Sequence, residues 1–436
     1  MKISRITVGG FKNLKKTVID MKNIVALVAL NNYGKSNLFQ AMRFAVNFMG
    51  YSAALKKQCM HSVENIPLNK HLDTADFDFE IVVELTEDES PVYTEAVYHY
   101  SFRWPKNDAG KMYGAEIIRE ELKLKPRGEH QKYETVLKRD EDKALFKASA
   151  TGRCSSKITA DSFELVLNKL AAYDNLPYLD VVKVLLSMKM IVEKHFDAEA
   201  IMDFSPISFY DDPVDLSAPG VNIADVLLKL KEKYNIEYLN LIDVFKQLVP
   251  SVEDVQIISR DFEVSPDMNK LAENTPFRVR NTENKILVKS RNINQYLDIS
   301  MLSSGTKRIL VLLLQTLHCK LKGAPVVALE EPENSIHPEL LQNLIEAIND
   351  LRGDMAVIYA SHSPNLIQYM DIDSIYFGIP NEFDYAVFKK INSKFARRIV
   401  KNAEQFDMSL GDFCFWLLSS CSGDDDKISD YFGGLE

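Results

Sequence analysis

The sequence predicts an α/β fold with a mixed central sheet, an antiparallel β layer and a helical insertion. Three observations predict it. Short apolar runs at residues 24–29, 324–329 and 355–359 have the length of buried strands, and each ends in a polar loop. Apolar residues alternate with polar ones at 77–85, as in half-buried strands. Residues 165–248 carry mainly helical patterns.

Composition limits the classes of protein that need to be considered. The chain has 436 residues, of which 46% are hydrophobic and 26% charged, which is typical of a globular protein of two or three domains. It has no apolar run near the length of a membrane span, so we expect no membrane contact. Its five cysteines are scattered without metal-ligand spacing, which fits a cytoplasmic protein.

The net charge of −10 argues against a generally basic, DNA-coating protein. Local basic patches exist at residues 123–127 and 389–398. Each could form part of a nucleic-acid groove, or be an ordinary solvated face.

The elements group into four expected parts. Residues 1–160 form the N-terminal half of the core, with strands at 77–85, 96–104 and 116–125 building the antiparallel layer. Residues 161–250 form the helical insertion, with helices at 181–192 and 223–234, the second capped by Asn222. Residues 251–395 form the C-terminal half of the core, with strands at 252–264 and 277–290 separated by a polar loop at 265–274. Residues 396–436 form a C-terminal helical tail.

A polar loop joins the first apolar run to a helix-like segment. Leu38, Met42 and Ala45 follow the loop at helical spacing. Strand, tight loop and helix is the context that a phosphate-binding loop requires, because backbone N–H groups and the helix dipole there favour anions. The candidate binding residues are Asn31, Asn32, Gly34, Lys35, Ser36 and Asn37.

Two side chains of this loop have specific expected roles. Lys35 would reach the β- and γ-phosphates, and the Ser36 hydroxyl would hold Mg²⁺. Ala29 stands where the phosphate-loop pattern begins with glycine, and we expect the turn to form if φ stays negative there. The alternative is a chance Gly-Lys-Ser after a strand.

Two carboxylates follow the apolar run at 324–329. Glu330 and Glu331 stand at the expected C-terminal end of a buried parallel strand, beside the crevice where ligands bind in open α/β sheets. Glu330 is placed to bind Mg²⁺, and Glu331 to orient or deprotonate an attacking water. The alternative is an acidic turn before the expected helix at 338–351.

A serine-rich segment precedes a strongly apolar helix. Ser303 or Ser304 is a good N-cap for the segment that follows, and Gly305 lies at its start. One interpretation is simply a capped core helix. The other adds an anion, namely the γ-phosphate of a nucleotide held by another subunit.

His362 follows the apolar run at 355–359, in a loop with Ser361, Ser363 and Pro364. A single histidine is more often structural than catalytic. Here it could hydrogen-bond a γ-phosphate or the attacking water.

In this order, the four segments resemble the motifs of the ABC-type ATPase heads of the SMC, RecF and OLD (overcoming lysogenisation defect) group. The resemblance equates residues 29–36 with Walker A, 302–306 with the signature, 326–331 with Walker B and His362 with the switch histidine. Residues 330–338 are similar to the Glu-Glu-Pro-Glu…His-Pro form of OLD-like proteins, and 3–14 to their first strand and basic turn. The resemblance is strong over residues 1–50 and 296–370.

The resemblance implies a fold and a function. The fold would be an ABC-ATPase head, with ATP and Mg²⁺ as ligands and a head-to-tail homo-oligomer that closes on the nucleotide. Lys12 would lie near phosphate or base, and residues 334–336 would form the D-loop at the dimer interface. Stand-alone OLD-like ATPases of bacterial antiphage and abortive-infection systems, such as the RloA and PARIS types, are the most similar, so we expect a separate effector protein as partner.

Two departures and one alternative accompany this expectation. No convincing Q-loop glutamine follows the Walker A helix, and the roughly 70 residues beyond His362 leave little room for the Toprim nuclease domain of OLD nucleases. Asp424 to Asp426 form a late acidic run that fits an exposed tail. The alternative is a RecF- or SMC-like ATPase of DNA repair or chromosome maintenance, in which ATP gates DNA binding; a phage component is another expected partner.

Overall fold

The structure is a computed structural model that describes residues 1–108, 111–193, 207–208, 216, 221–261, 278–279, 281–379, 383–391 and 393–420. The chain divides into two compact units: Met1–Met190 with Asp354–Glu436, and Ile191–Gly353. The expected polar loop at 265–274 and acidic run at 424–426 lie outside the described residues. The four expected domain boundaries remain a prediction.

An eight-stranded sheet forms the antiparallel layer of the first unit. Its order is β11-β10-β9-β8-β5-β4-β1-β2. The strands are β1 Lys2–Gly9, β2 Thr17–Asp20, β4 Phe77–Glu84, β5 Tyr93–Arg103, β8 Glu116–Pro126, β9 Glu134–Asp140, β10 Lys143–Lys147 and β11 Cys154–Ile158. Phe79, Ile81 and Val83 are all buried on one face of β4, as their alternation predicts. The hairpin of β6 Lys106–Asp108 and β7 Lys111–Tyr113 is separate.

A second group of strands carries the loops of interest. Strand β3 (Ile24–Val28) lies parallel to β19 (Ala356–Ser361) and to β20 (Ile375–Gly378). Strand β21 (Phe388–Lys390) is antiparallel to β20, so the sheet is mixed, as predicted. The side chains of β3 from Val25 onward are fully buried, which explains why this strand is a continuous apolar run.

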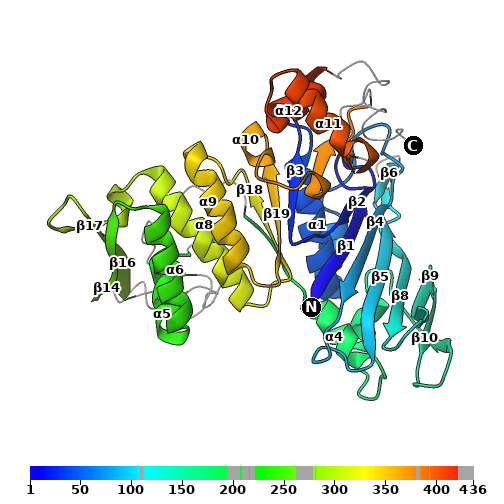
Figure 1. The fold of residues 1–436 in the computed structure, drawn as a ribbon. Coiled ribbons are helices and arrows are strands. Elements are labelled where there is room, and N and C mark those ends of the chain that lie inside the picture. Colours follow the sequence, from blue (N-terminus) through cyan, green and yellow to red (C-terminus); the bar gives the residue numbers. More distant parts are fainter. Residues whose placement is uncertain are drawn as a thin grey trace. The chain divides into compact units, whose positions relative to one another are not determined.

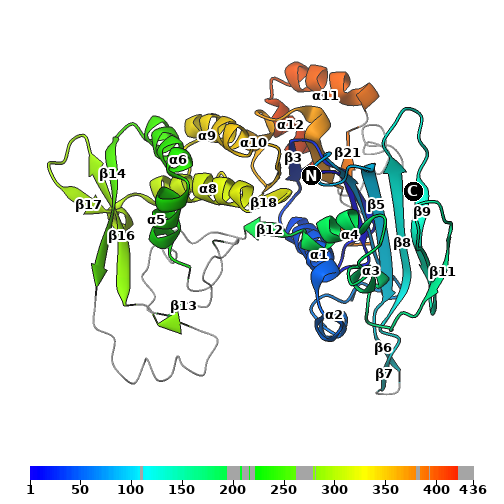
Figure 2. The same ribbon diagram turned by 90° about the horizontal axis from the view of Figure 1, so that it is seen from below.

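Helix α1 (Lys35–Gly50) packs on the antiparallel sheet through an aromatic cluster. The rings of Phe44 and Phe48 lie within 6.2 Å of that of Phe102 on β5. The Tyr100 hydroxyl donates to the Ala45 carbonyl at 2.9 Å. Figure 2 shows α1, α3 (Val166–Leu170) and α4 (Leu179–Ser187) along one face of this sheet, and α2 (Ala53–Met60) follows α1.

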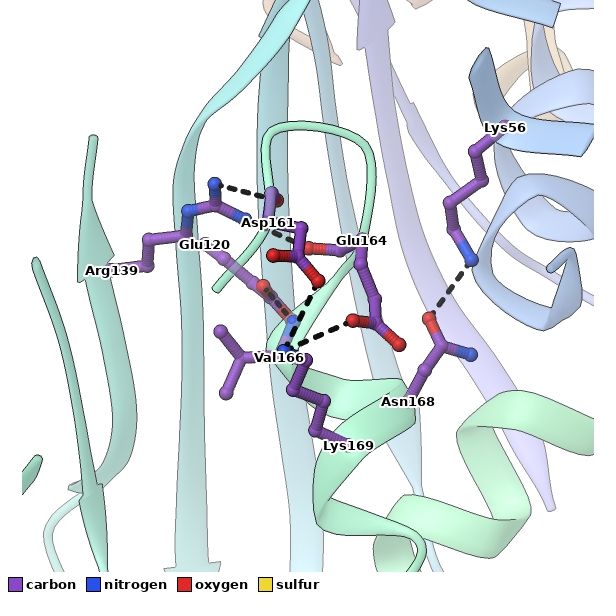
Figure 3. Close-up of polar contacts among 8 residues, drawn as sticks. All are labelled: Lys56, Glu120, Arg139, Asp161, Glu164, Val166, Asn168 and Lys169. Carbon is purple, nitrogen blue, oxygen red and sulfur yellow. Dashed lines mark hydrogen bonds and ion pairs between the residues drawn. The ribbon is translucent and has the colours of Figure 1, made fainter. Parts of the chain in front are cut away.

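Buried polar groups fasten α3 to the sheet (Figure 3). The carboxylate of Glu120, fully buried on β8, accepts the N–H groups of Val166 and Leu167 at 2.7 and 2.8 Å and the Tyr98 hydroxyl at 2.9 Å. The three donors compensate the buried carboxylate. In return, the carboxylate accepts two N–H groups at the start of α3 that have no acceptor within the helix.

A buried lysine on α2 holds the C-terminal end of α1 in place. The Lys56 ammonium donates to Asn168 Oδ1 at 2.9 Å and to the carbonyls of Met49 and Tyr51 at the C-terminal end of α1. The Asn168 amide also donates to Met49 O at 2.9 Å. The position of α1 therefore depends on α2 and α3 as well as on the sheet.

One predicted helix is shorter than expected. Residues 181–192 were predicted to be helical, but α4 ends at Ser187 and β12 (Met190–Glu193) follows. The backbone turns extended at Met188, with ψ 139°. All four residues of β12 are buried, and a short apolar run such as residues 190–192 does not distinguish a strand from a helix.

The second unit contains helices and a small sheet. Its elements are α5 Ile223–Lys233, α6 Asn235–Leu248, α8 Ser304–Leu321, α9 Pro338–Leu351, β13 Ile207–Ser208, β14 Val252–Asp261, β15 Arg278–Val279, β16 Thr282–Ser290, β17 Tyr296–Asp298, β18 Val326–Glu330 and the 3-10 turn η1 Ile299–Met301. Asn222 caps α5 by accepting the N–H of Ala224 at 2.7 Å, as predicted. Helices α8 and α9 lie side by side (Figure 2), and α9 has its predicted bounds.

The chain returns to the first unit with α10 (Pro364–Ile367), η2 (Ile372–Ser374), α11 (Ser393–Gln405) and α12 (Leu410–Ser420), drawn in orange and red in Figure 1. A Cβ on Gly411 would lie 2.1 Å from the Pro364 carbonyl oxygen, so α12 packs closely on the start of α10. Phe413 and Leu417 are buried, whereas Trp416 is 44% exposed. Among the described residues, no helix has the length and hydropathy needed to cross a membrane.

Candidate functional site

The turn after β3 has a backbone that requires glycine. Gly34 has φ +105° immediately before the first residue of α1. A Cβ there would lie 2.7 Å from the Cβ of Ala386 and 3.2 Å from Asn13 Oδ1. Both the backbone conformation and the surroundings therefore exclude a side chain. Ala29, at the other end of the turn, does not have a positive φ, which is the condition under which the turn was expected to form.

The N-terminus of α1 is arranged to bind an anion. No side chain caps it, and its first intrahelical bond runs from Leu38 N–H to Gly34 O at 2.9 Å. The N–H groups of the first turn therefore have no intrahelical acceptor, which is the arrangement that phosphate groups occupy at helix starts. Together with the turn at Gly34, which leaves no room for a side chain, this geometry fits a polyphosphate.

The polar side chains of the loop divide into two kinds. Lys35 is 9% exposed, and its ammonium donates to the Ala29 and Leu30 carbonyls at 2.7 and 3.2 Å, which holds the loop in a tight turn. Ser36 is exposed in the first turn of α1. Asn31 and Asn32 are exposed in the loop before the helix, and Asn32 has φ 61°.

Asn37 faces the turn between β1 and β2. Its amide donates to Asn13 Oδ1 at 2.8 Å, so it positions the loop. Lys12, in the same β1–β2 turn, has φ 52° and donates to Gln40 Oε1 on α1 at 2.6 Å.

The structure brings His362 to the same edge as the loop. In the β19–β3 register, Ser361 pairs with Val28, so the segments that follow these two residues leave neighbouring strand ends. The Ser361 hydroxyl accepts the Ser363 N–H at 2.9 Å, and Ser363 caps α10. His362 is half-buried within this turn.

The second unit holds the two carboxylates in a turn with an unusual backbone. Glu331 has φ 49°, a left-handed conformation that disfavours non-glycine residues. The guanidinium of Arg308 on α8 donates to the Glu330 and Glu331 carbonyls at 3.1 and 2.8 Å. The Asn334 amide donates to Glu331 Oε2 at 2.6 Å. The direction of this carboxylate is therefore fixed by its neighbours.

The signature segment is joined to this carboxylate turn. Ser303 is the N-cap of α8, and its hydroxyl accepts the Thr306 N–H at 3.2 Å. A Cβ on Gly305 would lie 2.3 Å from the Ser335 carbonyl oxygen, so only glycine permits this approach. Ser335 itself has φ 63°. Ser303 and Ser304 are exposed at the start of the helix.

Each unit thus assembles two of the four sequence motifs. The first unit joins the phosphate loop with His362, and the second joins Glu330 and Glu331 with the signature serines. The binding and catalytic roles of these residues remain predictions.

Sequence reasoning missed several residues that shape the site. Gly378 ends β20, and a Cβ there would lie 2.5 Å from the Tyr33 ring and 2.6 Å from the Ala29 Cβ, so it makes room for the loop. Asn13, Ala386 and Arg308 also contact the motifs. A glycine at the end of the apolar run Ile375–Gly378 was one available signal, and Asn13 lies in the segment 3–14 that the resemblance covers. Ala386 and Arg308 have no such signal.

Two protein-family models match the chain. Residues 1–180 match a family described as "AAA ATPase domain", and residues 189–368 one described as "AAA domain, putative AbiEii toxin, Type IV TA system". No curated protein matches it.

Solved structures show what the fold is similar to. A crystal structure of an SMC head bound to the C-winged helix domain of ScpA covers 91% of this chain and 100% of its own, at 14% identity and a TM-score of 0.51. An SMC head with an extended coiled coil, bound to the C-terminal domain of ScpA derived from Pyrococcus furiosus, covers 92% and 99%, at 13% identity and 0.49. The SMC head domain from Thermotoga maritima covers 90% and 100%, at 11% identity and 0.42.

These findings confirm the predicted fold class, because the first of these structures shows an SMC-head fold. The two family matches and this fold support an ATPase of the ABC/SMC type.

Proposed function

We propose that the protein binds and hydrolyses ATP and uses the nucleotide state to control a separate effector in a bacterial antiphage system. The observation that carries the ATPase half is the uncapped start of α1 behind Gly34, whose φ of +105° and close neighbours admit no side chain. Such a cradle binds phosphate groups through backbone N–H donors.

The ligands follow from the residue types. Lys35 would contact the β- and γ-phosphates, exchanging its bonds to the Ala29 and Leu30 carbonyls for charged phosphate oxygens. Ser36 and Glu330 would hold Mg²⁺, which would supply positive charge against the charge of the phosphate oxygens. Asn31, Asn32 and Asn37 would complete the loop around the phosphates.

Glu331 would act on water. The bonds from Arg308 and Asn334 fix the glutamate backbone and carboxylate in one direction, which is what a general base or water-orienting group needs. His362 would sense the γ-phosphate from the neighbouring strand end.

A second copy of the chain would complete the site. Ser303, Ser304 and Gly305 would contact the γ-phosphate bound to Lys35 of another protomer, in a head-to-tail arrangement. The α8 start is exposed at both serines, as this requires. The fold is that of an SMC head, which supports this arrangement.

The antiphage role has separate support. Residues 330–338 resemble OLD-like proteins, and residues 189–368 match a family whose description includes a toxin of a toxin–antitoxin system. ATP-dependent closure and opening of the pair would then switch the effector, with a phage component as the trigger.

The direct test is ATP turnover by the wild type, Glu331→Gln and, as a matched control, Glu339→Gln. Glu339 is exposed in the first turn of α9, within the same family-matched region. We expect Glu331→Gln to bind ATP but to lose at least about a hundredfold in turnover, the range of general-base catalysis, while Glu339→Gln keeps the wild-type rate. Normal hydrolysis by Glu331→Gln would refute the assigned role.

A second function is favoured by the SMC-head fold itself. In it, ATP gates binding of duplex DNA, and hydrolysis resets the protein. The discriminating measurement is duplex binding by the purified chain with and without ATP across a salt series. Tight ATP-dependent binding without any partner would favour DNA maintenance over effector control.

A further inference from the structure

A cavity of about 390 Å³ lies between β2 and β21 in the first unit. Its size is within the range of small-molecule sites. Residues 29–37 are not part of its wall, so it is distinct from the phosphate loop. None of the four sequence motifs contributes to it.

Four lysines line the wall in a chain of net charge −10. Among the described residues, the wall carries the ammonium groups of Lys15, Lys16, Lys389 and Lys390 and one carboxylate, that of Asp20, and Lys16 is paired with Asp78 at 2.9 Å. Arg5 and Lys390 engage the Asp20 carboxylate at 2.7 and 3.5 Å. Burial opposes ionisation of Asp20, but these two partners outweigh it and lower its pKa. The basic pair at 389–390, which the sequence left as either a groove or a solvated face, is half-buried here.

Aromatic rings lie beside these charges. Lys15 Nζ lies 5.0 Å from the centroid of the Tyr385 ring and 3.4 Å from its hydroxyl. Lys390 Nζ lies 4.9 Å from the centroid of the Tyr376 ring. Phe388 also lines the cavity. Tyr376 and Phe388 are almost fully buried, so Tyr385 is the partly exposed ring of the wall. An ammonium group beside a partly exposed aromatic ring suits a phosphate attached to a planar base.

The cavity shares a segment with the phosphate loop. Tyr385 and Phe388 line the cavity, while the Tyr33 hydroxyl donates to the Tyr385 carbonyl at 3.3 Å and the Tyr33 and Phe388 rings lie 6.2 Å apart. Ala386, between them, is the residue that excludes a side chain at Gly34. An occupant of the cavity would therefore fix the segment against which the loop is built.

We propose that this cavity binds a second phosphate-bearing ligand with a planar base, of the size of one nucleotide, apart from the nucleotide at the phosphate loop. Free nucleotides and the 5′ end of a nucleic-acid strand share this chemistry.

The test uses the full chain carrying Lys35→Ala, so that the phosphate loop no longer contributes. Isothermal titration measures binding of the four nucleoside 5′-monophosphates, a 5′-phosphorylated oligothymidylate and inorganic phosphate. We expect one site per chain for a nucleotide or for the oligonucleotide, and at least tenfold weaker binding of inorganic phosphate. Preference for the monophosphates identifies a free nucleotide; preference for the oligonucleotide identifies a strand end.

Two further variants in the same background locate the site. Lys15→Ala with Lys389→Ala removes two positive charges, and Val18→Glu places a carboxylate on an exposed residue of the wall. Both should weaken binding at least tenfold, whereas Val92→Glu, at a similarly exposed valine outside the wall, should not. No binding in the Lys35→Ala chain, equal binding of inorganic phosphate, or binding unaffected by Val18→Glu would each overturn the proposal. None of these results depends on ATP hydrolysis.

Discussion

Gly34 and Glu331, like Asn32, belong to the candidate site and have left-handed backbone conformations, with φ +105° for Gly34 and 49° for Glu331. Such conformations persist only where surrounding contacts hold them. For Gly34 the contacts are the steric walls of Ala386 and Asn13, and for Glu331 they are the hydrogen bonds of Arg308. The sequence predicted the glycine, because phosphate loops require one. It could not predict the glutamate conformation, because Arg308 lies 23 residues away.

Gly34→Ala should therefore abolish nucleotide binding and destabilise the fold. The new Cβ would meet the Ala386 Cβ at 2.7 Å in addition to the strained φ. The matched control is Gly323→Ala, where φ is +68° but no atom lies within 4 Å of the added Cβ. We expect the control to lose about 1 kcal/mol from backbone strain alone and to keep nucleotide binding, as measured by thermal unfolding and titration. Equal losses of binding in both variants would contradict the role of the cradle.

The buried Lys56 makes a prediction about pH. Burial lowers its pKa from the ordinary 10.5 to about 8. Between these two pH values the unfolded chain holds a proton that the folded chain has lost, so the contribution of Lys56 to stability rises with pH. Below pH 8 both states are protonated and the penalty of the buried charge is complete.

Lys56→Met should remove this rise, whereas Lys57→Met, at an exposed position, should keep it. The measurement is the denaturation midpoint of the three proteins across pH 7 to about 10.5. If the wild type and Lys56→Met show parallel curves, Lys56 does not titrate as stated.

At the scale of elements, α8 links the signature to the carboxylate turn. Ser303 caps its start, Gly305 admits Ser335, and Arg308 reaches the carbonyls of Glu330 and Glu331. The periodicity of the sequence predicted this helix and its cap. It did not predict the approach of Ser335, since a contact between two loops leaves no local pattern.

Substitutions of the two serines at the start of α8 distinguish helix capping from contact with the nucleotide. Ser303→Ala should lower stability by about 1 kcal/mol, the usual cost of a lost N-cap. Ser304→Ala should leave the unfolding midpoint unchanged, because Ser303 supplies the cap, but should reduce ATP turnover if Ser304 contacts the γ-phosphate. Denaturant unfolding and turnover of both variants check this, and a Ser304→Ala protein with wild-type turnover would remove that residue from the site.

Strand prediction shows the same division between local and distant causes. Strands β3, β4 and β19 were predictable because a strand buried on one face has alternating apolar residues and a strand buried on both faces is a continuous apolar run. Strand β12 was mistaken for the end of a helix, because four buried residues in a row carry no period. Strands β20 and β21, which bring Gly378 and Ala386 to the phosphate loop, were not predicted at all.

At the scale of the whole molecule, the motifs divide between the two units of the chain. The phosphate loop and His362 belong to one, and the carboxylates and signature to the other. The order of motifs predicted the ATPase fold. The order of motifs does not say which protomer supplies the signature. In the proposed head-to-tail dimer, which encloses the nucleotide between two protomers as in a sandwich, the second copy supplies it.

A mixing experiment tests this sandwich most directly. Lys35→Ala removes the phosphate contact, and Ser304→Arg blocks the signature at an exposed position. In a mixed dimer, intact Lys35 of one protomer faces intact Ser304 of the other. We predict that each variant alone is inactive in ATP turnover and that an equimolar mixture recovers about a quarter of the wild-type rate, since half of random dimers are mixed and each has one intact site. A mixture as inactive as its two components would contradict a site shared between protomers.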